Sequence, residues 1–575
     1  MTEHSQSIDA PAAGRRVLMG IPARATFTTA FRAFTPVPVR GLVYVALAFA
    51  LLLSLANVWL GDLNQDEGWY LYAARCFSEG ALPYHDFAFT QGPVMPLIYG
   101  AFVAPLVNLG GVVAGRAATA LLGLLAAALA AALAARLAPR GLGGAAGVAA
   151  FALVAVNAYQ SYFFAVVKTY ALGAVWLLAG FVLLSAARGQ RRRLYWMAAG
   201  MALALAAGTR LSAGIVLPVV ALALWFDRRR QPGGWFWFGA SAALMLSIEF
   251  IPFLLLSPEG LRFGLLDYHA GRRAGSLLAA CMYKAGFISR VAQAYLPALG
   301  LALVAAGVWW ARRPGRSGRG GTNAAVMAEA PLPWLLGVAA VAFAAVTLVH
   351  LAAPFPYDDY EVMVYPLGVA ALVGAAVRML PAGRPAYAAA AVLLAACVVS
   401  AGASPINQDW FSSGRDRIWW RLKDRPALSV LRDTARQVQK LTPPGSWLLT
   451  QDTYLAVEAN RPVPPGMELG PFCYYPEWTT ERAQACRVLN RAMFEDLLAT
   501  APAPMAAFSG YGLSIASPGV TELPPSEQAQ LQALVECRYA PAGQVAHFGQ
   551  AHTRLDLYRL RATQHSGLDQ RPTLR

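Results

Sequence analysis

Apolar runs of about 20 residues recur along this chain from residue 41 to about residue 403. A helix of that length matches the roughly 30 Å hydrocarbon core of a lipid bilayer. The 575-residue chain is 57% hydrophobic and only 14% charged, whereas soluble proteins carry roughly 25% charged residues. The sequence therefore predicts a polytopic α-helical membrane protein.

We expect about 11 transmembrane helices, in a membrane domain that covers 41–403. A basic N-terminal segment, 1–40, leads directly into the first span at 41–60, which is long enough to remain as an anchor. The further spans are expected at 116–137, 142–158, 163–187, 194–209, 211–226, 235–255, 287–311, 333–353, 361–379 and 385–403.

Segment 93–112 is ambiguous, because its hydropathy suits a span but prolines interrupt it. If it does not cross the membrane, the basic loops share the cytoplasmic side with the N-terminus, as the positive-inside rule requires. If it crosses, all later loops are inverted and most Lys and Arg residues face outward. We therefore expect 93–112 to lie along the outer interface as a juxtamembrane helix, within a first outer loop at 61–115.

This arrangement places the N-terminus in the cytoplasm and the C-terminus outside, in the plasma membrane (the inner membrane of a bacterium). The net charge of +16 lies mostly in the membrane domain, where basic residues set the orientation. No stripe of Lys and Arg interleaved with aromatic residues is present, which argues against a nucleic-acid partner.

The remaining segment, 404–575, is more polar and is predicted to be an exported α/β domain. Its pattern predicts helices at 427–440, 453–461 and 480–499 and strands at 446–452 and 505–510. No P-loop, GxSxG or HExxH motif occurs in it. The domain therefore carries no recognisable catalytic motif of its own.

Carboxylates gather in the first outer loop, where Asp66 and Glu67 follow the first span and Asp86 comes later. Acids close to hydrocarbon are costly and usually serve a function. A carboxylate here could act as a general base on a hydroxyl, or Asp66 and Glu67 could hold a divalent metal ion. The alternatives are that Asp66 is the N-cap of a helix and that Asp86 only stabilises its own loop.

Cations near the outer ends of spans are candidates for binding an anionic ligand. Lys168 and Arg210 each interrupt apolar sequence, and the outer loop 257–285 contains Arg272 and Arg273. A guanidinium near the outer leaflet suits a lipid phosphate. The alternatives are an intramolecular pair between Arg210 and Glu249, and contacts of the loop cations with phospholipid headgroups.

A further polar rim precedes the span at 361–379. It contains Tyr357, Asp358, Asp359, Tyr360 and Glu361. These aromatic residues could bind a sugar, or they could form an interfacial belt.

The first outer loop resembles that of a family of membrane glycosyltransferases. The matching sequences are DEGWY from Asp66, then PYHDF around Asp86, then GPVMPLIY ending at Tyr99. They are similar to the GT-C fold class, specifically the family-39-like group of protein O-mannosyltransferases and the lipid A aminoarabinose transferase. Gly115-Arg116 at the next span and the turn containing Arg210 also match. The departures are Gln91-Gly92-Pro93, in place of a His/Pro-Pro opening, and Lys168, where many members have an acid.

This resemblance implies two juxtamembrane helices in the first outer loop and a definite reaction. A sugar would move from a polyprenyl-phosphate donor to an extracytoplasmic hydroxyl on a lipid, glycan or protein, with inversion at the anomeric carbon. Asp66 would be the base, supported by Glu67 and Asp86. The donor phosphate and sugar would be bound by residues drawn from Arg210, Lys168, Arg116, Arg272, Arg273, Tyr357, Asp358 and Tyr360. No cofactor is required with certainty, although a divalent metal is possible.

Two other classes of protein fit the same chain. A lipid or sugar transporter or flippase would explain many spans and a charge such as Glu249 inside one of them. However, no inverted repeat is visible, and the other acids cluster at the outer rim. The second alternative is a non-catalytic scaffold that binds glycan through the exported domain.

Overall fold

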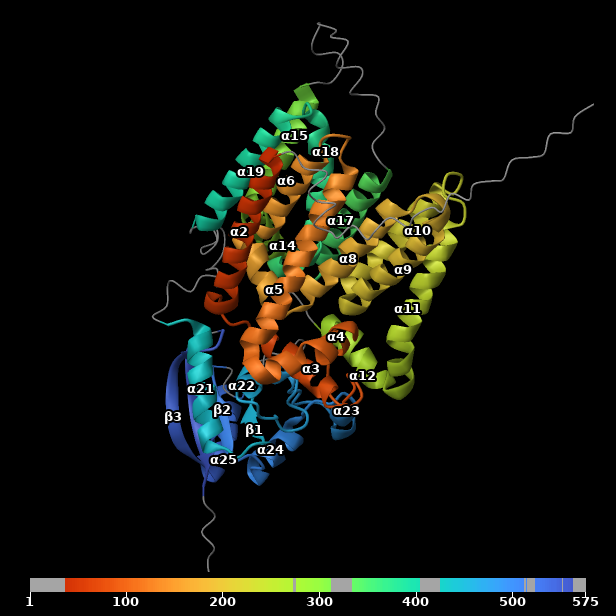
Figure 1. The fold of residues 1–575 in the computed structure, drawn as a ribbon. Coiled ribbons are helices and arrows are strands. Elements are labelled where there is room, and N and C mark those ends of the chain that lie inside the picture. Colours follow the sequence, from red (N-terminus) through yellow and green to blue (C-terminus); the bar gives the residue numbers. More distant parts are fainter. Residues whose placement is uncertain are drawn as a thin grey trace, which may run out of the picture.

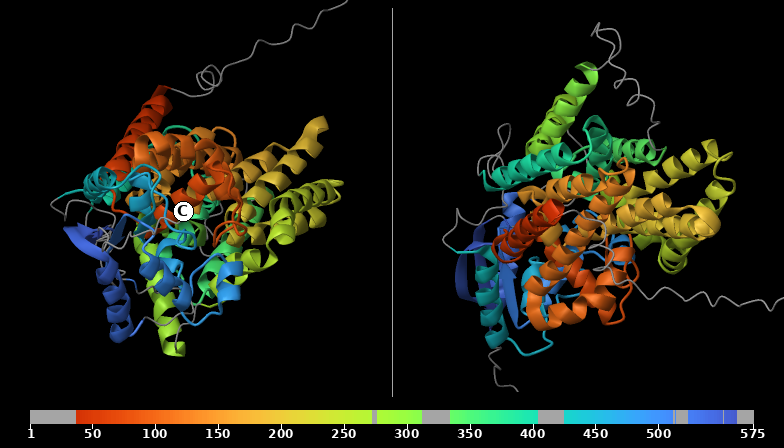
Figure 2. Two further views of the ribbon diagram at one scale, coloured as in Figure 1. Left: turned by 90° about the horizontal axis from the view of Figure 1, so that it is seen from below. Right: turned by 45° about the horizontal axis from the view of Figure 1, so that its top comes forward.

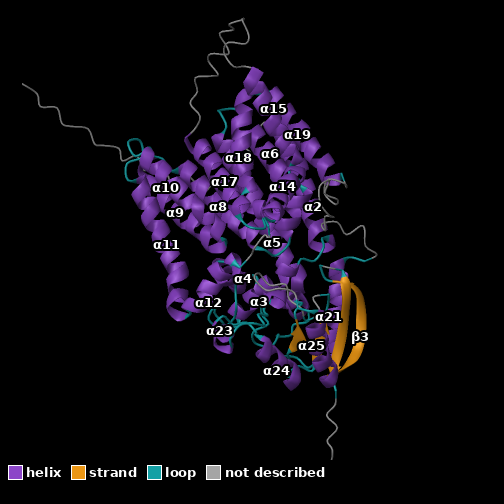
Figure 3. Cartoon of the chain, turned by 180° about the vertical axis from the view of Figure 1, so that it is seen from behind, coloured by secondary structure: helices purple, strands orange, loops and turns teal. Residues whose placement is uncertain are grey.

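The computed structural model describes residues 37–271, 276–311, 334–403, 425–510, 513, 523–550 and 552–561. A bundle of long helices forms the larger part, and a smaller domain lies beneath one end of it (Figure 1). All strands of the described residues belong to this smaller domain (Figure 3).

Hydropathy correctly located the helices of the bundle. Six helices are long and apolar enough to cross a membrane, or up to eight if each of two bent pairs counts as one span. The six are α2 (Val37–Leu60), α5 (Ala104–Leu137), α8 (Thr169–Ala186), α11 (Gly234–Leu256), α17 (Trp334–Ala352) and α19 (Arg384–Gly402). The bent pairs are α6 (Gly143–Ala155) with α7 (Ala158–Ala165), at 68°, and α14 (Leu277–Ala294) with α15 (Leu296–Ala311), at 87°.

Three expected spans are shorter or less apolar than these. They correspond to α9 (Arg192–Thr209), to η2 (Leu211–Ile215) with α10 (Val216–Phe226), and to α18 (Tyr365–Ala376) with η5 (Val377–Met379). The predicted boundary between 142–158 and 163–187 is wrong, because α7 is a separate short helix between them. A total of about 11 crossings stays a prediction.

Small residues allow the bundle helices to approach closely. Ala126, Ala130 and Ala134 of α5 are completely buried, as are Ala146 and Ala150 of α6. In lipid, helices associate through close van der Waals packing, which small side chains permit. The Ala-rich sequences that reduce the hydropathy signal therefore build the interior of the bundle.

The first outer loop contains two short helices, α3 (Gln65–Ser78) and α4 (Val94–Phe102). The nine residues of α4 extend about 14 Å, which is too short to cross a bilayer. The chain then enters α5, which is kinked at Gly111, where φ is 66°. Segment 93–112 therefore forms no transmembrane helix of its own.

The C-terminal domain is built on a mixed four-stranded sheet with the order β1-β2-β4-β3. Strands β1 (Leu448–Thr450) and β2 (Met505–Phe508) are parallel, whereas β3 (Tyr539–Phe548) and β4 (Thr553–Leu560) form an antiparallel hairpin against β2. The helices of the domain are α21 (Ala427–Leu441), α22 (Thr453–Glu458), α23 (Thr480–Ala485), α24 (Arg491–Thr500) and α25 (Pro525–Arg538).

One helix of this domain that the sequence predicts as continuous is interrupted in the structure. The expected helix at 480–499 is divided into α23 and α24. Arg487 has a positive φ of 58°, which interrupts the helix. Asn490 then starts α24 by accepting a hydrogen bond from the backbone N–H of Met493.

The C-terminal domain packs directly on the first outer loop, at the same end of the bundle (Figure 1). The hydroxyl of Tyr72 in α3 accepts a hydrogen bond from the backbone N–H of Val463 at 2.9 Å. His552 lies 2.9 Å from the carboxylate of Asp62, at the end of the first span. Seen from below, the helices α9 to α11 extend to one side of this domain (Figure 2). The loop and the domain therefore lie at the same end of the bundle.

Candidate functional site

Asn64, not Asp66, caps helix α3. The side chain of Asn64 accepts a hydrogen bond from the backbone N–H of Asp66 at 3.1 Å, and Glu67 accepts one from the N–H of Asn64 at 3.0 Å. This reciprocal arrangement is a capping box. The alternative that Asp66 serves as N-cap is therefore wrong, and its carboxylate is available for other contacts.

The carboxylate of Asp66 points toward a lysine from another segment of the chain. Its Oδ2 lies 2.9 Å from Nζ of Lys168, and its Oδ1 accepts a 3.3 Å hydrogen bond from the indole of Trp69. The Asp66 side chain keeps 26% of its exposure. These two contacts fix the orientation of the carboxylate without removing it from solvent.

Lys168 joins Asp66 to a third segment. Its Nζ is also 2.6 Å from Oδ2 of Asp359, in the short helix η4 (Asp358–Met363). Burial alone would raise the pKa of the Asp359 carboxyl, but Lys168 and then Arg210 outweigh this and hold it below its ordinary value. One ammonium thus lies between two carboxylates in a largely buried site.

Arg210 lies next to this group and is held mainly by aromatic rings. Its guanidinium carbon is 4.8 Å from the ring centre of Tyr170 and 4.6 Å from that of Tyr360. Its Nη1 donates a 3.3 Å hydrogen bond to Thr169, and within the described residues its buried Nε has no partner. A guanidinium stacked in this way retains donors for an anion.

The alternative pairing of Arg210 with Glu249 does not occur in the part of the chain that the structure describes. Glu249 is buried in α11, and neither of its carboxylate oxygens has a hydrogen-bond partner there. Its carboxylate instead faces the Cα position of Gly208, where an added Cβ would lie 2.2 Å from Oε2. Gly208 therefore leaves room for a carboxylate that no cation of the described residues neutralises.

Glu67 and Arg116 form a separate pair that is fully buried. Both side chains are 0% exposed, and Arg116 donates to the two Glu67 oxygens at 2.6 and 2.7 Å. Arg116 also donates to the backbone carbonyls of Gly61 and Asp62. The predicted catalytic role of Glu67 and the predicted phosphate-binding role of Arg116 do not fit this geometry, because neither group can reach a substrate. The pair instead attaches α3 to α5.

The fold of the chain is similar to that of a solved membrane protein. No family model and no curated protein matches the sequence. The crystal structure of ArnT from Cupriavidus metallidurans in the apo state has a TM-score of 0.57 at 18% identity, covering 90% of this chain and 98% of that chain. The chain has the ArnT fold.

The same ArnT bound to undecaprenyl phosphate has a TM-score of 0.57 at 17% identity, with the same coverage of both chains. Archaeoglobus fulgidus AglB, an archaeal oligosaccharyltransferase solved with an inhibitory peptide and a dolichol-phosphate, has a TM-score of only 0.41 at 13% identity, covering 92% of this chain and 75% of that chain. ArnT is a lipid A aminoarabinose transferase. The resemblance to the GT-C class that the first outer loop indicated is thus confirmed for the fold.

Asp66, Lys168, Asp359 and Arg210 together form what we call the Asp66 group. Within this ArnT-like fold, Asp86 lies apart from that group. It accepts a 2.7 Å hydrogen bond from the backbone N–H of Leu82 and pairs with His85 at 2.8 Å. It therefore lies beyond the C-terminal end of α3, whereas Asp66 is at the N-terminal end. The structure supports the alternative that Asp86 stabilises its own loop.

The residues of the polar rim before α18 contact two different sets of partners. Asp358 accepts hydrogen bonds from Tyr159 at 2.6 Å and from Arg290 at 2.9 Å, whereas Tyr360 faces Arg210. Tyr357 is exposed and stacks edge-on against Tyr360. The predicted donor residues Arg272 and Arg273 lie outside the described residues.

The carboxylates of this site do not form a metal site. Among the described residues, no group of three or more His, Cys, Asp or Glu side chains is placed to hold a metal ion. Asp66 faces an ammonium and Glu67 faces a guanidinium, and in each case the cation occupies the side where a metal would bind. A divalent metal at these two residues, which the sequence left as a possibility, does not fit this geometry.

Sequence reasoning missed the partner of Lys168. The sequence indicates Asp359 only as one member of the polar rim, and it gives no signal for Arg290. The contact between Lys168 and Asp359 joins positions 191 residues apart. The only available signal was the pair of adjacent acids, Asp358 and Asp359, before an apolar run.

Proposed function

We propose that this protein is a membrane glycosyltransferase that moves a sugar from a polyprenyl-phosphate donor to a hydroxyl group outside the cytoplasm. The observation that carries the proposal is the grouping of Asp66, Lys168 and Arg210. A partly exposed carboxylate and two cations from three separate segments meet at the end of the bundle that the C-terminal domain covers. A base for the acceptor and cations for a leaving phosphate are what this reaction needs.

Asp66 is the base in this proposal. Lys168 and Trp69 orient its carboxylate, and its remaining exposure gives an acceptor hydroxyl access. The acceptor oxygen attacks the anomeric carbon, and the bond from that carbon to the phosphate oxygen breaks. Asp66 takes the hydroxyl proton, and the phosphate leaves with the electron pair. A single displacement of this kind inverts the anomeric centre.

Arg210 stabilises the departing phosphate. Its guanidinium is held between Tyr170 and Tyr360, which fixes its plane while leaving Nε unused among the described residues. Fixed donors directed at developing negative charge are among the largest contributions to catalysis. Lys168 adds a second positive charge close by. The undecaprenyl phosphate bound by ArnT, which shares the fold, supports a donor of this class.

The test is a donor-consumption assay on the full chain in lipid. Polyprenyl-phosphate sugars are supplied together with membrane extract as acceptor, and released polyprenyl phosphate is measured. Asp66→Asn keeps the size of the side chain but removes its basicity, so we expect release to fall by at least about 100-fold. The matched control is Asp267→Asn, at the end of the helical turn η3 (Phe263–Asp267), where Asp267 pairs with Arg262 at 3.4 Å. We expect this control to release polyprenyl phosphate at the wild-type rate.

Binding of the donor separates this proposal from its main alternative. Saturable donor binding without release from any donor, by the wild-type chain, would indicate a transporter or flippase. Full release by Asp66→Asn would reject Asp66 as the base. The identities of the sugar and of the acceptor follow from the products of the wild-type reaction.

A further inference from the structure

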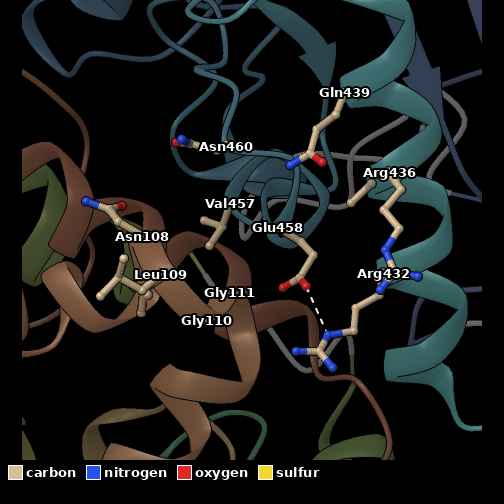
Figure 4. A pocket seen from close by; sticks show the side chains of 12 residues that line it. Asn108, Leu109, Gly110, Gly111, Arg432, Arg436, Gln439, Val457, Glu458 and Asn460 are labelled. Carbon is tan, nitrogen blue, oxygen red and sulfur yellow. Dashed lines mark hydrogen bonds and ion pairs between the residues drawn. The ribbon is translucent and has the colours of Figure 1, made fainter.

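A second site lies on another face of the first outer loop. A pocket of about 350 Å³ opens between the kinked start of α5 and the helices α21 and α22 of the C-terminal domain (Figure 4). Its lining residues include none of the Asp66 group. The polar side chains around it are Asn108, Arg432, Arg436, Gln439, Glu458 and Asn460.

The lining of this pocket carries an excess of positive charge. Arg432 and Arg436 are four residues apart on α21 and therefore share one face of that helix. The one carboxylate in the lining, Glu458, pairs with Arg432 at 3.3 Å and accepts a 2.7 Å hydrogen bond from the backbone N–H of Val112. Arg436 contacts Asp433 at 3.2 Å but is 70% exposed. Donors of Arg436 therefore remain accessible to an anion.

Apolar side chains border the pocket on its bundle side. Arg432 lies 5.4 Å from the ring centre of Trp59, a half-exposed residue near the end of the first span. On α5, Leu106 is half exposed and Leu109, which lines the pocket, is 90% exposed. Tryptophan near the end of an apolar helix is typical of the region where headgroups meet acyl chains. In a bilayer, the pocket would therefore lie at the height of the lipid headgroups.

The shape of the pocket depends on a close contact at Gly111. Its φ of 66° is the left-handed conformation that favours glycine, and an added Cβ would lie 2.2 Å from the Glu458 carboxylate. Because Glu458 also binds the N–H of Val112, the kink of α5 and the end of α22 form one rigid wall. The opposite wall is the arginine-bearing face of α21.

We propose that this pocket binds the phosphorylated headgroup of an anionic membrane lipid. Arg436 and Arg432 would contact the phosphate, Asn108 and Asn460 would contact the polar substituent, and the acyl chains would follow Leu106, Leu109 and Trp59. Arginine pairs phosphate oxygens through several donors at once, and basic residues at the bilayer surface select anionic lipids. This site is independent of the proposed transferase reaction, since the two share no residue.

The test measures lipid binding by the full chain in detergent micelles, using native mass spectrometry and thermal unfolding. The probes are phosphatidylglycerol, phosphatidylcholine and inorganic phosphate, each added separately. Arg436→Gln removes a cation from the pocket, and Asn108→Asp adds a negative charge without breaking an ion pair. The control is Arg554→Gln, an exposed arginine on β4 that pairs with Asp556 away from the pocket. Gel filtration and circular dichroism verify that each variant is folded.

We expect the wild-type chain and Arg554→Gln to retain phosphatidylglycerol more strongly than phosphatidylcholine. Arg436→Gln and Asn108→Asp should each weaken phosphatidylglycerol binding by about fivefold, as expected for one unit of charge near an anionic headgroup. Equal retention of the two lipids by the wild-type chain, or unchanged binding in both variants, would overturn the proposal. If inorganic phosphate binds as tightly as phosphatidylglycerol, the site is one for free phosphate and the lipid assignment is wrong.

Discussion

The central residues of the candidate site are Lys168 and the two carboxylates that it joins. Isolated charges in a poorly hydrated site are costly, but here one ammonium contacts Asp66 at 2.9 Å and Asp359 at 2.6 Å. The excess negative charge of this group is offset by Arg210 nearby. The buried lysine is thus accommodated, because η4 supplies an acid from another part of the chain.

Replacing Lys168 by Met leaves two carboxylates without their shared cation. We expect a loss of about 3–5 kcal/mol in the free energy of unfolding, since removing one partner of a buried ion pair leaves uncompensated charge. Thermal unfolding in detergent measures the effect, with Lys440→Met on the exposed surface of α21 as the control. Adding Asp359→Asn to Lys168→Met should restore part of the loss. An unchanged unfolding midpoint in Lys168→Met would contradict this account of the ion pair.

The stability of the site also depends on pH. The folded-state pKa of Asp359 is below its ordinary value, so its contribution to stability is present above the pKa of the unfolded chain and is lost as the pH falls through the folded-state pKa. We therefore expect the wild-type chain to lose more stability than Asp359→Asn between neutral pH and the acidic range. Unfolding midpoints of the two chains at a series of pH values test this, and parallel curves would contradict it.

Arg210 and lysine are not interchangeable at the proposed phosphate site. Lysine lacks the flat guanidinium that stacks against Tyr170 and Tyr360. It also carries a single nitrogen, whereas arginine can bind two phosphate oxygens through two nitrogens. We expect Arg210→Lys to weaken binding of a polyprenyl-phosphate donor by about tenfold, which corresponds to the loss of stacking and fork geometry. Donor-binding titrations measure this, with Arg262→Lys as the control, because Arg262 is an exposed residue at the end of the short helix α12 (Pro258–Arg262). Equal donor affinities in the wild type and Arg210→Lys would argue against phosphate binding at Arg210.

At the scale of elements, helix α3 positions the proposed base. Its capping box fixes the first turn, and the buried pair of Glu67 with Arg116 attaches that turn to α5. Asp66 lies between Asn64, which caps the helix, and Glu67, which binds Arg116. The backbone of Asp66 is therefore fixed on both sides. The paired acids therefore serve different purposes, since one is structural and its neighbour faces the site.

Loss of the cap should affect activity more than stability. Asn64→Ala removes the side chain that accepts from the N–H of Asp66, which costs about 1 kcal/mol for a typical cap. Asn490→Ala removes the cap of α24, far from the site along the chain, together with hydrogen bonds that Asn490 donates to Trp478 and Thr480, so it should cost at least as much. We expect donor consumption to fall in Asn64→Ala and to persist in Asn490→Ala, although Asn490→Ala should unfold at the same or a lower temperature. Equal activities would show that the cap does not position Asp66.

The sequence predicted elements better than it predicted contacts. Hydropathy located the bundle helices, and 93–112 forms no separate span, since α4 is short and 104–112 continues into α5. The orientation inferred from the basic residues stays a prediction. The division of 480–499 into two helices was not predicted, because the break depends on a positive φ at Arg487, which residue type does not reveal. The contact between Lys168 and Asp359 could not be predicted, since it depends on how two irregular segments far apart in sequence pack together.

At the scale of the whole molecule, the C-terminal domain completes the outer end of the bundle. It contacts α3 through Val463, the first span through His552, and α5 through Glu458. These contacts reach the first outer loop at its start, in the middle of α3 and at the kink of α5. The domain therefore packs at the same end of the bundle as helix α3, which carries Asp66.

The central claim is that the site is the group around Asp66 and not the whole set of acids in the first outer loop. The most direct measurement is acceptor-dependent release of polyprenyl phosphate by the full chain in lipid, comparing Asp66→Asn with Asp86→Asn. The structure predicts loss of release in Asp66→Asn and near wild-type release in Asp86→Asn, because the hydrogen-bond partners of the Asp86 carboxylate among the described residues, Leu82 and His85, belong to its own loop. Full activity in Asp66→Asn, or loss of activity only in Asp86→Asn, would contradict the account.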